Sequence, residues 1–237
     1  MLKEVFWLDG VSSSSVGISL QGPPRFSSPV PIVERKRIPG RNGYIIFDTG
    51  VYENRTGVFE CFSLSEDVEA TLRCVNNYLF KKSGYRKLET QNDPFHFWMA
   101  RVESGARMEI RNGVLAPYEI KFDCKPQRFL KSGDSEIKFS SEGGVLTNHT
   151  FYEAKPLIKI YGIEPGVVKI GSCKINVLDM TDSPIIIDCE TMDIHGGYKN
   201  LSDRISMDKF PILVPGENII EVSGVTTVSI TPRWWEL

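Results

Sequence analysis

The sequence predicts a mainly β protein of two domains, and three observations support this. In "PYEIKFDC", every second residue from Tyr118 to Cys124 is apolar or cysteine, which is the alternation of a half-buried strand. A helical pattern is confined to one stretch of the chain. Beyond residue 150, short strand-like runs are separated by the turn signals EPG, TDSP, HGG and VPGEN, a spacing typical of a β-sandwich.

Other strand-like segments are rich in aromatic and β-branched residues. They are "TGVFECFSL" (56–64), "FHFWMARVES" (95–104), "KPLIKIYG" (155–162) and "VTTVSI" (225–230). In "FPILVPGENIIEVSG", Pro215 and Gly216 predict a tight turn with Gly216 at positive φ. The flanks, Phe210–Val214 and Ile219–Val222, are predicted to be paired strands.

One helix is predicted from about Glu66 to Lys82, lying against a sheet. Its apolar stripe consists of Val68, Leu72, Val75 and Leu79. We expect Ser63 or Ser65 to cap the N-terminus of this helix and Gly84 to stop it.

The segment "PIVERKRIPGRNGYIIFDTG", about residues 30–50, predicts a long hairpin with a charged, glycine-rich distal part. Its basic residues are Arg35, Lys36, Arg37 and Arg41. Such a hairpin is too polar to be packed inside its own domain, so we interpret it as an arm that reaches solvent or another subunit. Phosphate or nucleic-acid binding is the alternative, but Glu34 interrupts the cluster and only Tyr44 and Phe47 are near enough to stack on bases.

Composition changes between Pro126 and about Thr150, where the chain becomes polar and rich in glycine and serine. We place a domain boundary near Pro126–Ser132 and predict domains 1–128 and 129–237.

The 237 residues carry a formal net charge of −2, which provides no global attraction for nucleic acid or anionic lipid. No apolar run reaches bilayer length, and "MLKEVFWLDG" lacks the apolar region of a secretory signal, so we expect folding in a cytoplasm without membrane insertion. The five cysteines are odd in number and include no C-x-x-C pair, so most are predicted to be small buried residues.

No catalytic or cofactor motif is present in the sequence, including the P-loop, G-x-G-x-x-G, H-E-x-x-H and G-x-S-x-G patterns. His96, His149 and His195 lack the spacing of zinc ligands. We therefore predict no enzyme activity, no cofactor and no metal.

The strongest candidate for chemistry is the acidic run "LDMTDSPIIIDCETMDIHGG". Asp188 and Glu190 are expected on one face of a strand, where they could serve glycoside hydrolysis or calcium binding. Further carboxylates nearby in the sequence are Asp179, Asp182 and Asp193. The preferred interpretation is a solvated strand face, with the opposite face formed by Ile185, Ile187 and Cys189.

The final "RWWEL" contains Trp234 and Trp235, which either anchor a partner or fold back onto their own sheet. A sugar-binding β-sandwich is a further alternative for the second domain. That domain has no tryptophan before this pair to present an aromatic plane to a sugar.

Several segments, in order, resemble the siphophage distal tail protein (Dit) family. "FPILVPGENIIEVSG" followed by "VTTVSITPRWW" resembles the family's C-terminal pattern FP-L-PG-N-I-G-V-I-P. "FWLDGVSSSSVGI" resembles its first strand pair and "ERKRIPGRNG" its basic GR-G element. "ENRTGVFECFSL", "DPFHFWMARV", "GVLAPYEIKFDCKP" and "NHTFYEAKPLIKIYG" complete the order, so the resemblance covers essentially the whole chain.

The resemblance implies a structural protein of the virion tail tip and not an enzyme. It implies an N-terminal β-sandwich-like domain with one helix and a protruding hairpin called a belt, and a C-terminal galectin-like β-sandwich. Six copies would form a ring hub around the DNA exit channel, assembled in the host bacterial cytoplasm, without specific nucleic-acid binding. The belt, with Arg35, Lys36, Arg37 and Arg41, would contact a neighbouring protomer.

The implied partners are the tail tube protein, a tail-associated lysin or tail fibre protein and, in many phages, a receptor-binding protein. The C-terminal domain of this chain departs from a galectin because it lacks the tryptophan and the His-Asn-Arg cluster of a sugar site. We therefore expect that domain to be a docking platform.

Overall fold

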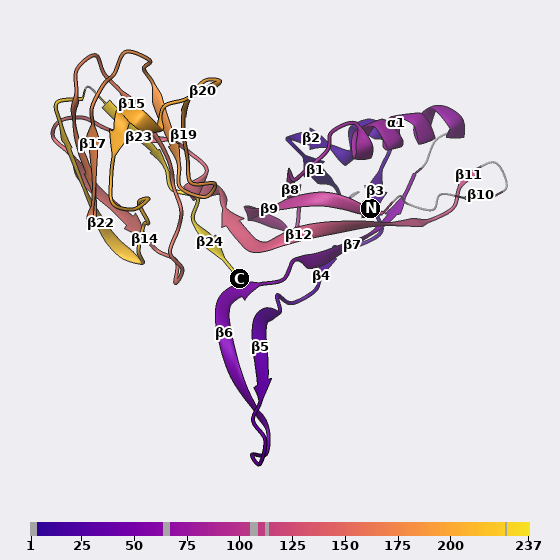
Figure 1. The fold of residues 1–237 in the computed structure, drawn as a ribbon. Coiled ribbons are helices and arrows are strands. Elements are labelled where there is room, and N and C mark those ends of the chain that lie inside the picture. The colour runs from indigo at the N-terminus through magenta and orange to yellow at the C-terminus, as the bar shows by residue number, and fades with distance from the viewer. Residues whose placement is uncertain (1–3, 64–66, 105–108, 112–113, 226) are drawn as a thin grey trace. The chain divides into compact units, whose positions relative to one another are not determined.

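The chain is mainly β and divides into two compact units (Figure 1). The computed structural model describes residues 4–63, 67–104, 109–111, 114–225 and 227–237. Unit 1 comprises residues 1–128 with Leu237, and unit 2 comprises residues 129–236. Within the described ranges α1 (Val68–Phe80) is the one α-helix, and no helix there is long and apolar enough to cross a bilayer.

Unit 1 is built on one large sheet with the strand order β2-β1-β8-β9-β12-β7-β3, and β4 also pairs with β7. Its strands are β1 (Phe6–Leu8), β2 (Val11–Ser12), β3 (Ser19–Leu20), β4 (Arg25–Phe26), β7 (Arg55–Phe62), β8 (Arg86–Thr90), β9 (Asp93–Ser104) and β12 (Tyr118–Leu130). Two smaller hairpins are formed by β5 (Pro31–Arg37) with β6 (Tyr44–Tyr52), and by β10 (Ile110–Arg111) with β11 (Val114–Leu115). A 3-10 turn, η1 (Ser13–Val16), follows β2.

The core of unit 1 is aromatic. Phe6, Phe59 and Phe122 are fully buried and meet edge to face, with ring centroids 4.9–5.8 Å apart. The alternation predicted for Tyr118–Cys124 is confirmed, because the apolar residues and Cys124 are buried while Glu119 and Lys121 are exposed.

Helix α1 is two residues shorter at its C-terminal end than predicted, and its N-cap differs. The Asp67 carboxylate accepts a hydrogen bond from the Ala70 N–H (2.9 Å), so Asp67 is the cap. The predicted cap Ser63 is buried and bonds instead to the Tyr118 hydroxyl (2.9 Å), while Ser65 and Glu66 lie outside the described residues. Tyr78 fixes the helix to the sheet, because its hydroxyl accepts from the Leu8 N–H (3.1 Å).

Unit 2 is a β-sandwich of two sheets. Their orders are β13-β23-β15-β18-β19-β20 and β14-β22-β16-β17-β21. The strands are β13 (Ile137–Phe139), β14 (Gly144–Asn148), β15 (Leu157–Tyr161), β16 (Gly166–Ile170), β17 (Cys173–Val177), β18 (Ile185–Asp188), β19 (Asp193–Gly196), β20 (Lys199–Asn200), β21 (Ile205–Ser206), β22 (Gly216–Ser223) and β23 (Thr227–Thr231). The 3-10 turns are η2 (Lys131–Gly133) and η3 (Ser202–Arg204), and β24 (Trp235–Glu236) pairs with β12.

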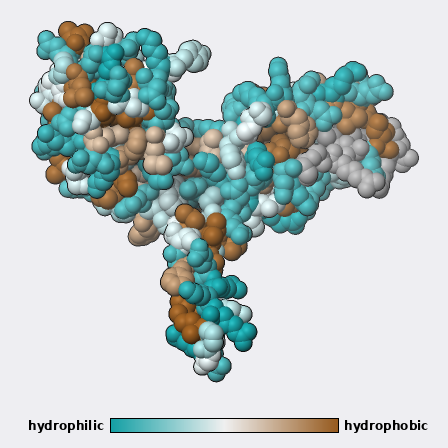
Figure 2. All heavy atoms as spheres, viewed as in Figure 1, coloured by the Kyte–Doolittle hydropathy of each residue, from teal (hydrophilic) through white to brown (hydrophobic). Residues whose placement is uncertain are grey.

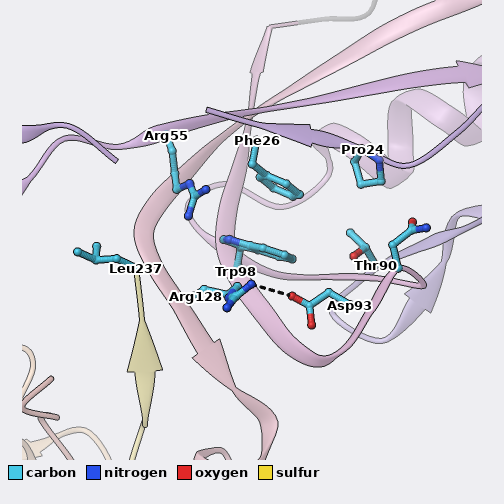
Figure 3. Close-up of a pocket in the computed structure, with 9 residues that line it drawn as sticks. Pro24, Phe26, Arg55, Thr90, Asp93, Trp98, Arg128 and Leu237 are labelled. Carbon is cyan, nitrogen blue, oxygen red and sulfur yellow. Dashed lines mark ion pairs between the residues drawn. The ribbon is translucent and has the colours of Figure 1, made fainter. Parts of the chain in front are cut away.

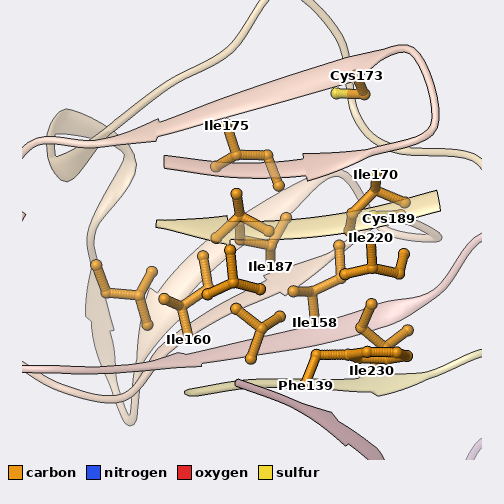
Figure 4. Close-up of a cluster of buried hydrophobic side chains, with 14 of the residues drawn as sticks. Phe139, Ile158, Ile160, Ile170, Cys173, Ile175, Ile187, Cys189, Ile220 and Ile230 are labelled. Atoms are coloured by element: carbon orange, nitrogen blue, oxygen red, sulfur yellow. The ribbon is translucent and has the colours of Figure 1, made fainter. Parts of the chain in front are cut away.

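Isoleucine dominates the core between these two sheets (Figure 4). Ile158 and Ile187 of one sheet and Ile175 and Ile220 of the other are all essentially inaccessible to solvent. β-branched side chains of this kind pack well between pleated surfaces.

The Pro-Gly turn is present, but the strand pairing predicted around it is wrong. Gly216 has φ +88°, as the turn requires. Phe210–Val214 does not pair with β22; Leu213 instead forms an isolated bridge with Ala154, and β22 pairs with β14 and β16. The buried Asn218 side chain closes the turn, because its Oδ1 accepts from the Val214 N–H (2.9 Å) and its Nδ2 donates to the Val214 carbonyl (2.9 Å).

Candidate assembly interface

The hairpin of β5 and β6, which we call the arm, is a separate two-stranded sheet of unit 1 (Figure 1). Its antiparallel register pairs Arg37 with Tyr44 and Arg35 with Ile46. The register shifts near the base of the arm, where Gly50 adopts φ +71° and the Thr49 hydroxyl donates to the Ile32 carbonyl. The extra residues at this shift lie on β6, and irregularities of this kind strengthen the local twist of a ribbon.

The two strands of the arm differ in chemistry. β5 carries Arg35, Lys36 and Arg37, whereas the facing part of β6 reads "YIIF". The β6 side chains are exposed to an extent unusual for large apolar residues, at 63% for Tyr44, 61% for Ile46 and 51% for Phe47. Figure 2 shows apolar residues lying beside polar ones along the arm.

Register places cations and apolar groups on both faces of the arm. Paired residues of antiparallel strands point to the same side, so Arg35 and Arg37 share a face with Tyr44 and Ile46. Lys36 and Phe47 lie on the opposite face. Either face of the ribbon can therefore offer both charge-assisted hydrogen bonds and apolar contact.

The basic side chains of the arm form no ion pair with the acidic residues that the structure describes. Arg35, Lys36, Arg37 and Arg41 are exposed, and no ion pair joins them to a carboxylate in the described parts of the structure. Elsewhere, cations such as Arg25 and Arg233 pair with Glu60 and Asp188. The arm is thus a local excess of positive charge on a protein of slightly negative net charge.

A two-stranded ribbon is marginally stable by itself in water, and both edges of the arm have unpaired backbone groups. A long arm with large exposed apolar residues is typical of a surface that is covered by another protein. The predicted basic residues lie on this surface. The apolar strand beside them was not predicted as part of it, although the run of four apolar residues "YIIF" in a polar hairpin was a usable signal.

The C-terminal tryptophans lie against unit 2. Trp234 is buried in its core, so it cannot anchor a partner in this conformation. Trp235 is half-buried, stacks on Tyr152 with ring centroids 4.3 Å apart, and donates from Nε1 to the Glu153 carbonyl (2.9 Å). Of the two arrangements left open by the sequence, folding back is the one observed; a partner contact by the accessible part of Trp235 stays a prediction.

The expected Asp188 and Glu190 pair does not form on one strand, because β18 ends at Asp188 and Glu190 lies in the following turn. Arg233 binds the Asp188 carboxylate with two hydrogen bonds (2.7 and 2.9 Å), and the Glu190 N–H donates to it as well (2.9 Å). Burial tends to raise the pKa of Asp188, but these bonds outweigh burial and the pKa is lowered. Asp188 is therefore an ionised structural carboxylate.

Asp179 and Asp182 also have structural roles. Asp179 pairs with Arg204, and Asp182 pairs with Lys199 (2.9 Å). In the described residues no group of three or more His, Cys, Asp or Glu side chains could hold a metal ion. His96 bonds through Nδ1 to Asp93 (2.7 Å), and His149 and His195 lie in unit 2.

All five cysteines are free, and all except Cys74 are buried. Burial raises the pKa of the thiols of Cys61, Cys124 and Cys189 to about 12. These three are small core residues and not reactive thiols, as predicted.

The fold is similar to that of the SPP1 Dit (gp 19.1) protein, described as a paradigm of the hub adsorption apparatus in phages that infect Gram-positive bacteria. The similarity covers 99% of each chain with a TM-score of 0.69, at 14% sequence identity. No family model matches the sequence, and no curated protein matches it. The chain therefore has a Dit-like fold.

Proposed function

We propose that this chain is a structural component of a phage tail hub and that it acts at the tail tip. Two observations support the proposal: the likeness of fold to the SPP1 Dit protein along the whole chain, and an arm whose composition suits contact with another protein. The observation that carries it is the arm, because exposed apolar side chains beside unpaired cations have no function inside a single copy.

In this proposal six copies close into a ring around the DNA exit channel, and the arm contacts the neighbouring copy as a belt. The tail tube protein binds one side of the ring, and a tail-associated lysin, fibre or receptor-binding protein binds the other. Unit 2, as a galectin-like domain, serves as a docking platform. A stable closed ring requires each repeated interface to bury about 1,000 Å² or more.

Mass photometry and negative-stain microscopy of the purified protein test the ring. We expect wild-type protein to form annular particles and the R35E/K36E/R37E/R41E variant to remain monomeric. The melting temperature of the variant should stay within about 8 °C of that of the wild-type monomer, because each of the four substitutions of an exposed, unpaired side chain changes stability by about 0.5 kcal/mol or less.

A matched control reverses four exposed cations outside the arm. Arg73, Lys81, Lys138 and Lys174 are exposed and without an ion pair in the described structure, and R73E/K81E/K138E/K174E changes the net charge equally. This control should still assemble. A wild-type protein that is strictly monomeric at high micromolar concentration, or a control that fails as the arm variant does, would contradict the proposal.

Carbohydrate binding by unit 2 is the second candidate, favoured by one observation. A shallow pocket of about 300 Å³ is lined by Asp193, His195, Gly197, Tyr198, Lys199 and Asn200, and Tyr198 is fully exposed there. An exposed aromatic ring beside polar side chains can stack on a sugar. Saturable binding on a glycan array, lost in Tyr198→Ala but kept in Phe151→Ala, would support it; Phe151 is a similarly exposed aromatic residue of the same unit.

A further inference from the structure

Unit 1 contains a pocket of about 260 Å³ in which hydrogen-bond donors converge (Figure 3). Arg55 of β7, Trp98 of β9 and Arg128 of β12 line it, and they come from strands that lie together in one sheet. Phe26 of β4 forms part of the wall by stacking on Trp98, with ring centroids 4.2 Å apart and an interplanar angle of 13°.

The Trp98 indole has an unused donor. Its side chain is only 4% exposed, yet its Nε1–H has no hydrogen-bond partner within the described part of the chain. Buried donors are almost always bonded, so this N–H is suited to an acceptor that enters the pocket. In Figure 3 the nitrogen-bearing end of Trp98 lies between the guanidinium groups of Arg55 and Arg128.

Arg55 has no acidic partner. Its Nε–H donates to the Ser27 carbonyl (2.9 Å), but no described carboxylate forms an ion pair with it. Desolvation by burial lowers the pKa of Arg55, and the nearby charge of Arg128 lowers it further. Half-buried cations are normally compensated, so this guanidinium suits an anionic ligand.

Arg128 pairs with Asp93 (3.6 Å), and Asp93 also bonds to His96 (2.7 Å). The lining side chains include two guanidinium groups and one carboxylate, and Leu237 also lines the pocket. A guanidinium and an indole N–H beside an aromatic wall fit a monovalent anionic group on a short apolar stem better than a dianionic phosphate.

We propose that this pocket binds a carboxylate. One carboxylate oxygen accepts from the guanidinium N–H groups of Arg55, and the other accepts from the Trp98 indole N–H. The apolar stem of the ligand packs on the Phe26 and Trp98 rings. This site is independent of the ring proposed above, and neither proposal requires the other. The carboxylate belongs either to an acidic side chain of a bound protein segment or to a free small acid, and the probes below distinguish these sources.

The experiment follows the Trp98 indole N–H signal in ¹H–¹⁵N spectra of the full chain at constant ionic strength. Four probes are titrated: N-acetylglutamate N′-methylamide, its glutamine analogue, butyrate and inorganic phosphate. We expect a saturable shift with the glutamate probe and none with the glutamine probe. Tighter binding of the glutamate probe than of butyrate indicates a protein segment, and the reverse order indicates a free acid.

Two variants and a control test the residues. Arg55→Lys keeps the charge but loses the fork and should weaken binding about tenfold. Trp98→Phe keeps the aromatic stack but removes the indole N–H, and with it the signal that the titration follows. For this variant the backbone signals of Thr90 and Asn92, which also line the pocket, are followed instead, and we expect a several-fold loss of affinity. Arg25→Gln removes an exposed arginine that pairs with Glu60 and should bind like wild type.

Folding of each variant is checked by the dispersion of the remaining signals. The proposal is overturned if no carboxylate gives a saturable shift, if the glutamine probe binds equally, or if phosphate binds more tightly than both carboxylates. It is also overturned if Arg55→Lys and Trp98→Phe, both folded, bind with wild-type affinity.

Discussion

Replacing Asn218 by alanine should destabilise unit 2 far more than a typical polar substitution. The side chain is 2% exposed and forms four hydrogen bonds. Its Oδ1 accepts from the Val214 N–H, and its Nδ2 donates to the carbonyls of Val214, Gly216 and Leu146 at 2.9–3.2 Å. It thus replaces the strand pairing that the turn lacks.

The expected cost follows from these bonds. The amide nitrogen has two hydrogens for three acceptors, so the side chain counts for about three full bonds at about 1 kcal/mol each. The carbonyls beside the exposed Val214 regain water in the variant, whereas the carbonyl of Leu146, a core residue, loses the Asn218 Nδ2 donor away from solvent. We therefore expect Asn218→Ala to lower the free energy of unfolding by about 2–4 kcal/mol.

Urea denaturation followed by tryptophan fluorescence and far-ultraviolet circular dichroism measures this cost. Asn176→Ala is the control, because Asn176 makes a single hydrogen bond to the Ser206 carbonyl (3.3 Å) and should cost about 1 kcal/mol or less. If Asn218→Ala lies within about 0.5 kcal/mol of wild type, the amide does not hold the turn and our account of this segment is wrong.

Three further substitutions or labels test other parts of unit 2 and the helix. Asp188→Asn should lower the free energy of unfolding by about 2 kcal/mol at pH 7, because it breaks the two-bond pair with Arg233. Folding lowers the pKa of Asp188, so wild type loses this stabilisation as the pH falls through the folded-state pKa. The stability of the variant, measured from pH 7 to pH 2, should lack this pH-dependent loss. Gly133→Ala places a Cβ against the backbone nitrogen of Trp234, so a loss of about 1–3 kcal/mol is expected in urea, and wild-type stability would contradict the close approach. Thiol labelling of the native protein should modify Cys74 first, with the other cysteines reacting only on unfolding; fast reaction of a second thiol would show that the cores are more open than described.

The regular parts of the fold were predictable because they depend on local periodicity. The alternation in Tyr118–Cys124 and the apolar stripe of α1 each require that one face be buried, whatever lies opposite. The arm was predictable for the reverse reason, since Arg35–Arg37 beside a glycine-rich turn could not enter a core.

The rest depended on contacts between distant segments. Ser63 was a reasonable helix cap from its position in the sequence, but its hydroxyl bonds to that of Tyr118, and Asp67 caps the helix. Asp188 was expected to present a free carboxylate, but Arg233, forty-five residues away in sequence, binds it. No local pattern carries such information.

The proposed carboxylate pocket also depends on contacts between segments that are distant in the sequence. Arg55 and Trp98 belong to separate strands and meet only through the order of the sheet. Neither residue has sequence neighbours that form a motif. The basic residues of the arm, in contrast, were predicted from the sequence. Its apolar strand was not predicted as part of the surface, although the run "YIIF" was a signal for it, and the register of the two strands required the structure.

The composition of the arm also bears on the fate of a chain that has not yet found its neighbours. Arg35, Lys36, Arg37 and Arg41 fall within seven residues, each accessible, so trypsin-like proteases meet several cleavage sites on one ribbon. Cutting there would sever the distal part of the arm while leaving the aromatic core of unit 1 and the sandwich of unit 2 folded. Burial of the ribbon by another protein would hide those sites, so resistance to digestion marks the copies that have been incorporated.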